Sequence, residues 1–187
     1  KMEIQEIIAL VKETKSFVGN RERAGHVKVK GQADYVTQVD TDIQNFLARE
    51  LGRRFPDIQF LGEEEGLHEM SGDIYWILDP IDGTTNLIHD YHHCVVSLAL
   101  YYKGEITLGI VYDPFREDIY YAQKGTGSFL NGVPIHVSDA EHLSETIITV
   151  GTSPYDRELA DENFKRIRRV FDHAQDIRRT GTAAMDL

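Results

Sequence analysis

The chain has 187 residues, of which 41% are hydrophobic and 10% aromatic, so we expect a globular protein with a packed core. Its formal net charge of −11 argues against direct binding of nucleic acid or of an anionic membrane surface. The single cysteine, Cys94, excludes an internal disulfide and fits a reducing, cytoplasmic location. Because the start of the chain has no long apolar run, we expect neither a signal peptide nor a membrane span.

The first third of the chain predicts two helices separated by a loop. Apolar residues recur at helical spacing between Ile4 and Val11, which predicts an amphipathic helix over residues 3–15. The polar, glycine-containing segment 25–36 predicts a mobile loop. The residues at 40–42 form a cluster typical of helix N-caps, and the apolar stripe behind them predicts a second helix.

Strands follow these helices. Residues 58–65 predict a strand that runs into an acidic turn, and residues 73–79 predict a second, buried strand. From Val95 to Val137, β-rich runs alternate with turn residues, which predicts an antiparallel meander.

The end of the chain predicts an α/β portion. It contains in order a strand, a helix, and a strand followed by a glycine turn and a helix start, at residues 146–153, 156–172 and 176–187. The apolar residues expected to face inward from the long helix are Leu159, Phe164, Ile167 and Val170. Since Leu187 falls a few residues into a helix without a stop signal, we expect an incomplete C-terminal portion. We divide the chain into residues 1–140, a metal-binding α+β portion, and 141–187.

Acidic residues follow three apolar segments of this pattern. They are Asp40 after "YVTQV", Glu63 and Glu64 after "FLG", and Asp79 and Asp82 around "PI" after "YWIL". Carboxylates gathered at one sheet edge repel each other unless a cation lies between them, and Mg²⁺ suits all-oxygen ligation. Taken singly, these residues also fit a helix cap, a solvated acidic turn and an ordinary Asp-Pro turn.

The residues around Asp82 add the other half of such a site. The carbonyl of Ile81 lies between the two aspartates in sequence and would supply a neutral ligand. Gly83, Thr84 and Thr85 present consecutive backbone N–H groups at the predicted start of a helix, which is a natural seat for phosphate. Bound cations would also offset the negative charge that otherwise disfavours a phosphate substrate. The pattern therefore predicts a Mg²⁺-dependent phosphate ester site.

Three stretches, "FLGEEE", "WILDPIDGTTNLIH" and "IRRTGTAAMDL", resemble the signature motifs of the inositol monophosphatase family, and the meander resembles it in order and spacing. The resemblance implies an α+β fold, a layered α/β/α/β/α sandwich of the inositol monophosphatase and fructose-1,6-bisphosphatase type. It implies a Mg²⁺-dependent, lithium-sensitive phosphatase that acts on a small phosphorylated polyol. It also implies a cytoplasmic homodimer that binds neither nucleic acid directly nor a membrane.

The resemblance further implies roles for the metal-binding residues. Glu63 should bind the first Mg²⁺ and position the attacking water. Asp79 should bridge the two ions, and the Ile81 carbonyl should complete the first site. Asp82 should bind the second ion and contact a substrate hydroxyl. A further metal-binding aspartate of the family would follow Leu187, so the second site is incomplete in this sequence.

The remaining implied roles concern the phosphate and the polyol. The amides of Gly83, Thr84 and Thr85 should receive the phosphate, and the Thr84 hydroxyl should pair with Asp40 to tune the attacking water. The residues that should line the polyol pocket are Gly181, Thr182 and Ala183. On a strand, Arg178 and Arg179 face opposite sides, so at most one of them reaches the pocket.

The implied reaction is direct hydrolysis of inositol monophosphate by a metal-activated water, with no phosphoenzyme. Two alternatives stay open. One is a fructose-1,6-bisphosphatase or dual-specificity sugar phosphatase, and the other is a regulatory protein of the same fold that acts through protein contacts.

Overall fold

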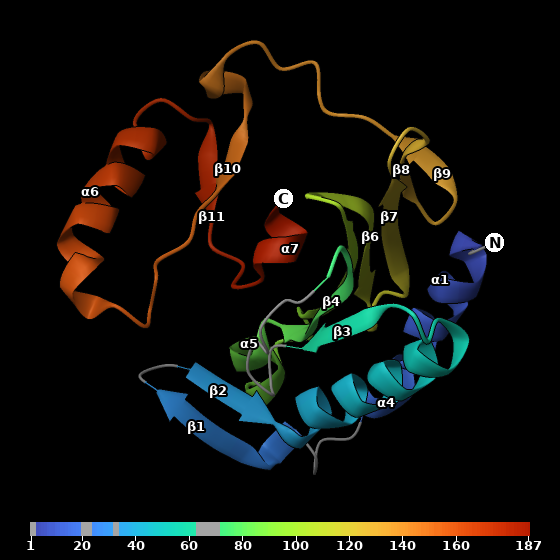
Figure 1. The fold of residues 1–187 in the computed structure, drawn as a ribbon. Coiled ribbons are helices and arrows are strands. Elements are labelled where there is room, and N and C mark those ends of the chain that lie inside the picture. Colours follow the sequence, from blue (N-terminus) through green and yellow to red (C-terminus); the bar gives the residue numbers. More distant parts are fainter. Residues whose placement is uncertain (1–2, 20–23, 32–33, 63–71) are drawn as a thin grey trace.

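The computed structural model describes residues 3–19, 24–31, 34–62 and 72–187, and its centre is one large sheet (Figure 1). This sheet has seven strands in the order β3-β4-β5-β6-β7-β8-β9. Their bounds are Gln59–Gly62, Ile74–Asp82, Val95–Tyr102, Glu105–Asp113, Asp118–Gln123, Gly127–Leu130 and Val133–Ile135. β3 and β4 are parallel and every later neighbour is antiparallel, so the predicted meander is confirmed.

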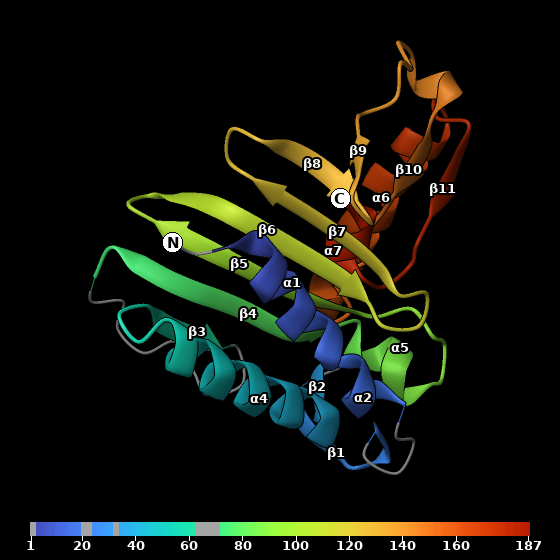
Figure 2. The same cartoon turned by 90° about the vertical axis from the view of Figure 1, so that its right-hand side faces the viewer.

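Two helices cover one face of this sheet, as Figure 2 shows: α1 (Ile4–Glu13) and α4 (Gln38–Arg54). Their apolar stripes meet the inward side chains of the central strands, and Val11, Leu47 and Trp76 are all fully buried. Each large side chain buried in this way contributes about 1.5–3 kcal/mol to folding. The predicted first helix is confirmed, although it is interrupted at Thr14, after which α2 (Lys15–Val18) continues. No helix in the described part of the chain is long and apolar enough to cross a membrane.

The segment predicted as a mobile loop is instead a β-hairpin. β1 (Val27–Gly31) pairs antiparallel with β2 (Asp34–Thr37). The sequence "VKVK" alternates apolar and polar residues with the period of a strand, and this signal outweighs its polar composition. The prediction of a loop is therefore wrong for the described residues of this segment.

The start of α4 also differs from the prediction. The N-cap is Thr37, whose side chain accepts a hydrogen bond from the Val39 amide. Asp40 is the third residue of the helix and accepts from the Thr37 amide at 2.8 Å, which closes a capping box. The prediction of an N-cap at residues 40–42 is wrong, because the hydroxyl of Thr37 caps the helix three residues earlier.

The C-terminal elements lie beside the large sheet in both views. They are η1 (Leu143–Glu145), β10 (Ile147–Thr149), η2 (Arg157–Leu159), α6 (Ala160–Phe171), β11 (Asp176–Arg178) and α7 (Ala183–Asp186). β10 and β11 form a separate parallel pair, as the predicted α/β portion requires. None of the residues predicted to face inward from the helix at 156–172 is buried, since Leu159 and Phe164 are 49% and 57% exposed and Ile167 and Val170 are half-buried. The boundary at residue 140 stays a prediction.

Candidate functional site

A β-bulge at the end of β4 brings Asp79 and Asp82 to one cavity. Asp79 pairs with Ser97 of β5 and Asp82 with Val95, so β4 has one residue more than its partner over this stretch. In a regular strand, residues three apart point to opposite faces, and the extra residue reverses this. Both aspartates therefore line the same cavity, which has a volume of about 360 Å³.

Directly after Asp82, the chain turns into the short helix α5 (Thr84–Ile88), as predicted. Gly83 makes this turn with φ of +95°, a value that favours glycine. A Cβ atom at Gly83 would lie 2.7 Å from Thr182 Oγ1, so a side chain has no room there. Gly83, Thr84 and Thr85 all line the cavity beside the two aspartates.

The expected contact between Thr84 and Asp40 is confirmed. Thr84 Oγ1 lies 3.1 Å from Asp40 Oδ1 and 3.0 Å from the Ile81 carbonyl oxygen. A hydroxyl has one hydrogen to donate, so these two acceptors compete for it. Asp40 is 2% exposed, and its burial raises the pKa of its carboxyl group, whereas hydrogen bonds from Thr37 and Thr84 lower it.

The first turn of α7 contacts Asp82. The Ala184 amide donates to Asp82 Oδ2 at 2.6 Å. Burial raises the pKa of Asp82, against the hydrogen bonds from the Ala184 and Ala183 amides, which lower it. A carboxylate that burial destabilises is one that a bound cation would stabilise, so Asp82 suits a metal ligand.

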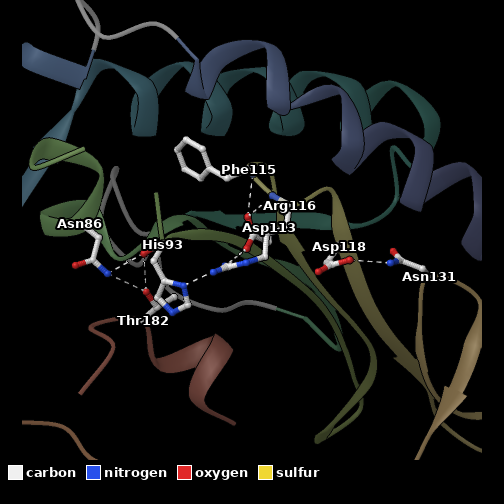
Figure 3. Close-up of polar contacts among 8 residues, drawn as sticks. All are labelled: Asn86, His93, Asp113, Phe115, Arg116, Asp118, Asn131 and Thr182. Atoms are coloured by element: carbon white, nitrogen blue, oxygen red, sulfur yellow. Dashed lines mark hydrogen bonds and ion pairs between the residues drawn. The ribbon is translucent and has the colours of Figure 1, made fainter. Parts of the chain in front are cut away.

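Asn86 of α5 ties the turn before α7 to the start of β5 (Figure 3). Its Nδ2 lies 2.7 Å from the His93 carbonyl oxygen and 2.9 Å from the Thr180 carbonyl oxygen. The Thr182 hydroxyl donates to the same His93 carbonyl at 2.9 Å. Helix α5, which follows the turn at Gly83, and the turn at Thr182 are therefore held together by hydrogen bonds to one acceptor, the His93 carbonyl oxygen.

The His93 ring contacts an arginine that pairs with a buried aspartate, also drawn in Figure 3. Asp113 has a fully buried side chain, and its Oδ2 accepts from Arg116 Nη1 at 2.8 Å. The same nitrogen lies 3.3 Å from His93 Nδ1. Because a guanidinium only donates, Nδ1 must be the acceptor, which leaves the ring hydrogen on Nε2. His93, Asp113 and Arg116 are not among the residues that line the cavity.

Not every predicted residue reaches the cavity. Gly181 lines it, but Thr182 is 1% exposed and lies behind it, and Ala183 is not among the lining residues. Arg179 lines the cavity, while Arg178 pairs with Asp176, so the prediction that at most one of these arginines points inward is confirmed.

Sequence reasoning missed several lining residues, which come from elements far apart in the chain: Tyr35, Asn86, His89, Pro154, Tyr155 and Arg157. Asn86 and His89 had a local signal, since both lie in the stretch "WILDPIDGTTNLIH" behind the Gly-Thr-Thr turn. Tyr35 comes from the β1–β2 hairpin and Arg157 from η2, and both elements are far from Asp79 and Asp82 in the sequence. No local spacing could therefore have predicted that these two residues line the cavity.

The donor set fits a hard cation in part. Asp79 and Asp82 supply carboxylates, and the Ile81 carbonyl adds a neutral oxygen, the ligand types that Mg²⁺ prefers. Within the described ranges, no group of three or more His, Cys, Asp or Glu side chains is arranged to hold a metal ion. The predicted ligand Glu63 and its neighbour Glu64 lie outside the described residues.

The fold matches that of several solved structures. The extragenic suppressor protein suhB from Bartonella henselae has a TM-score of 0.88 and 32% identity, over 97% of this chain and 70% of its own. An IMPase/NADP phosphatase complexed with Mg²⁺ and phosphate has a TM-score of 0.80 and 27% identity, over 97% of this chain and 68% of its own. The fold is thus the α+β sandwich of IMPases and suhB proteins.

Sequence comparison gives the family. Residues 2–187 match the inositol monophosphatase family, and the chain belongs to it. The Nus factor SuhB of Xylella fastidiosa is 38% identical over 87% of this chain. The inositol monophosphatase of Dictyostelium discoideum is 35% identical over 98% of this chain and 70% of its own length. The matched part of this chain spans 58% of the Xylella protein.

Proposed function

We propose that this protein is a Mg²⁺-dependent phosphomonoesterase that hydrolyses inositol monophosphate, or a related polyol phosphate, to the polyol and phosphate. The observation that carries the proposal is the bulge in β4, which turns Asp79 and Asp82 toward the cavity that Gly83 also lines. The Dictyostelium relative is named an inositol monophosphatase, and a structural neighbour is a complex with Mg²⁺ and phosphate, which supports the same function.

In this proposal, Asp79, Asp82 and the Ile81 carbonyl hold Mg²⁺, together with Glu63. When bound, Mg²⁺ lowers the pKa of a water molecule and offsets the negative charge of the phosphate. Such an ion would offset the charges of Asp79 and Asp82, which by themselves would repel a phosphate ester placed beside them.

Thr84 and Asp40 orient the attacking water. When the Thr84 hydroxyl donates its hydrogen to Asp40, the Ile81 carbonyl is released to act as a ligand. The lone pairs of the Thr84 oxygen can then accept a hydrogen from the water and point the water's oxygen at phosphorus. Since the phosphoryl group passes directly to water, no side chain has to act as the nucleophile. Cys94 is buried and takes no part.

The remaining residues bind the substrate. The amides of Gly83, Thr84 and Thr85 receive the phosphate oxygens, and Asp82 with Gly181 forms the wall for the polyol. We also propose that the protein is a cytoplasmic homodimer, as the resemblance implies.

The function is tested by phosphate release from inositol 1-phosphate with and without Mg²⁺. Asp82→Asn keeps an acceptor for the Ala184 amide but removes the charge, so the variant should fold and lose more than about 100-fold in turnover, since even partners of metal ligands cost 10–100-fold. Asp57→Asn, an exposed aspartate away from the cavity, is the matched control. An Asp82→Asn variant as active as the control would remove Asp82 from the metal site.

A second candidate is a regulatory protein that acts through protein contacts. The Xylella relative, named Nus factor SuhB, favours it. A folded, full-length protein that hydrolyses neither a polyol monophosphate nor a bisphosphate in Mg²⁺ would support this candidate and refute the enzyme.

A further inference from the structure

The turn between β8 and β9 carries a chemistry that the proposed function does not use. Leu130 pairs with Val133, so Asn131 and Gly132 form a two-residue hairpin loop. Their φ angles are +51° and +86°, and Asn-Gly is the preferred pair in such loops because both residue types tolerate the left-handed region. Asn131 is also the only asparagine in the sequence that a glycine follows.

An asparagine followed by glycine is prone to lose its side-chain amide in water. The Gly132 backbone nitrogen attacks the Cγ atom of Asn131 and passes its proton, through water, to the amide nitrogen, which leaves as ammonia. Water then opens the five-membered succinimide at either of its two carbonyl carbons, which yields aspartate or isoaspartate. The sum of these steps takes up one water molecule and replaces a neutral amide with a carboxylate. Glycine favours the attack because it has no side chain to shield its nitrogen.

In the folded protein, three hydrogen bonds hold Asn131 against β7. Its backbone amide donates to the Ile119 carbonyl oxygen at 2.9 Å, and its Oδ1 accepts from the Ile119 amide at 2.9 Å. Its Nδ2 donates to Asp118 Oδ1 at 2.8 Å, a contact drawn in Figure 3. Ring closure pulls Cγ toward the Gly132 nitrogen and away from β7, so these side-chain bonds have to open before the reaction can occur.

The product of the reaction cannot form the same bonds. A carboxylate at position 131 keeps one oxygen for the Ile119 amide, but its second oxygen takes the place of Nδ2 and only accepts. That oxygen would face the Asp118 carboxylate, to which Nδ2 now donates at 2.8 Å. Two carboxylates at such a distance repel each other. The modified turn would therefore be pushed away from β7.

We propose that Asn131 is a deamidation site that the native fold protects, and that its conversion detaches the β8–β9 hairpin from β7. The bonds to Asp118 and Ile119 slow the reaction in the native protein. Once the carboxylate has formed, the hairpin loses its polar contact with β7. Because β9 is the last strand of the large sheet, the loosened hairpin lies at a sheet edge, where an unpaired strand is open to other chains.

The rate of conversion is measured by mass spectrometry and isoaspartate content of the peptide around residue 131, at mildly alkaline pH, in buffer and in urea. Urea should speed up the conversion by at least about tenfold, because it removes the bonds to β7. Asp118→Ala should speed it up about 10- to 100-fold in buffer, the scale of one lost hydrogen bond to a charged group. Asp57→Ala, an exposed aspartate next to β3 at the opposite edge of the sheet, is the matched control and should leave the rate unchanged.

A second experiment tests the effect of the product by amide hydrogen exchange of β8 and β9. Asn131→Asp should speed up the exchange of these strands by about tenfold or more, because it places a carboxylate opposite Asp118. Adding Asp118→Asn to this variant should restore most of the protection, since the amide introduced at position 118 can donate to the carboxylate introduced at 131. Asn45→Asp, which adds the same charge at an exposed position of α4, should leave the exchange of β8 and β9 unchanged.

Three results would overturn the inference. Equal rates of conversion in buffer and in urea would show that the native bonds do not protect Asn131. No conversion in urea would show that Asn131 is not a deamidation site. Unchanged exchange of β8 and β9 in the Asn131→Asp variant would show that the product does not detach the hairpin.

Discussion

Replacing Gly83 with alanine should destabilise the protein by about 2–5 kcal/mol, clearly more than the same replacement at Gly104. The two glycines have nearly the same backbone conformation, with φ of +95° and +96°. Both alanines therefore incur the cost of the left-handed region, about 1–2 kcal/mol. Both also gain the same small benefit from a stiffer unfolded chain.

The difference between the two sites comes from their neighbours. At Gly83 the added Cβ would lie 2.7 Å from Thr182 Oγ1 and 3.1 Å from the His93 carbonyl oxygen, while at Gly104 nothing lies within 4 Å. Crowding of this kind in a packed site costs about 1–3 kcal/mol, and only the Gly83 variant incurs it.

Urea unfolding of both variants, followed by circular dichroism, measures the difference. Thr182→Ala removes the crowding oxygen, so the double variant with Gly83→Ala should be more stable than the sum of the single changes indicates. Equal losses of stability at Gly83 and Gly104 would show that the turn at Gly83 is not in contact with Thr182. A double variant whose loss is simply additive would exclude Thr182 as the cause.

Other changes test the surroundings of the site. Asn86→Ala removes the donor to two carbonyls and should cost about 2 kcal/mol in urea unfolding; no loss would contradict these bonds. Asp113→Asn should cost about 2–3 kcal/mol, because a buried carboxylate loses its charge beside Arg116, and an unchanged midpoint would count against this ion pair. Burial raises the pKa of Cys94 to about 12, so its thiol should resist a disulfide reagent at pH 9 until the protein unfolds, and native stability should fall as pH rises from about 9 to 12; rapid labelling of the native protein would refute this. Glu63→Gln should lower kcat far more than it raises KM, and unchanged kcat would remove Glu63 from the site.

The sequence was sufficient to locate the candidate metal ligands, but not to explain how their side chains come to face one cavity. Their pattern predicted only that Asp79 and Asp82 gather at one sheet edge. In the structure β4 continues through Asp82, and the bulge against β5 turns both side chains to the same side. A bulge depends on the register of the partner strand, which begins thirteen residues later, so the local sequence could not reveal it.

Long-range contacts set the same limit elsewhere. The cluster at 40–42 predicted a helix cap, and local reasoning could not decide between Asp40 and Thr37, since both residue types cap helices. The contact of Asp40 with Thr84, 44 residues later, was expected only from the family resemblance. On α6, the periodicity identified an apolar stripe, but periodicity does not say which neighbour covers it, and Phe164 is 57% exposed.

Asn86 shows why the two halves of the site cannot move independently. Its amide binds the carbonyls of His93 and Thr180, and the Thr182 hydroxyl binds the same His93 carbonyl. α5 and the turn at Thr182 therefore share one acceptor, and the position of Asp82 relative to that turn is fixed again by the Ala184 amide. A variant that loosens this connection should change substrate affinity and stability together. The geometry of the cavity is thus set by hydrogen bonds between the two motifs, which each motif alone does not encode.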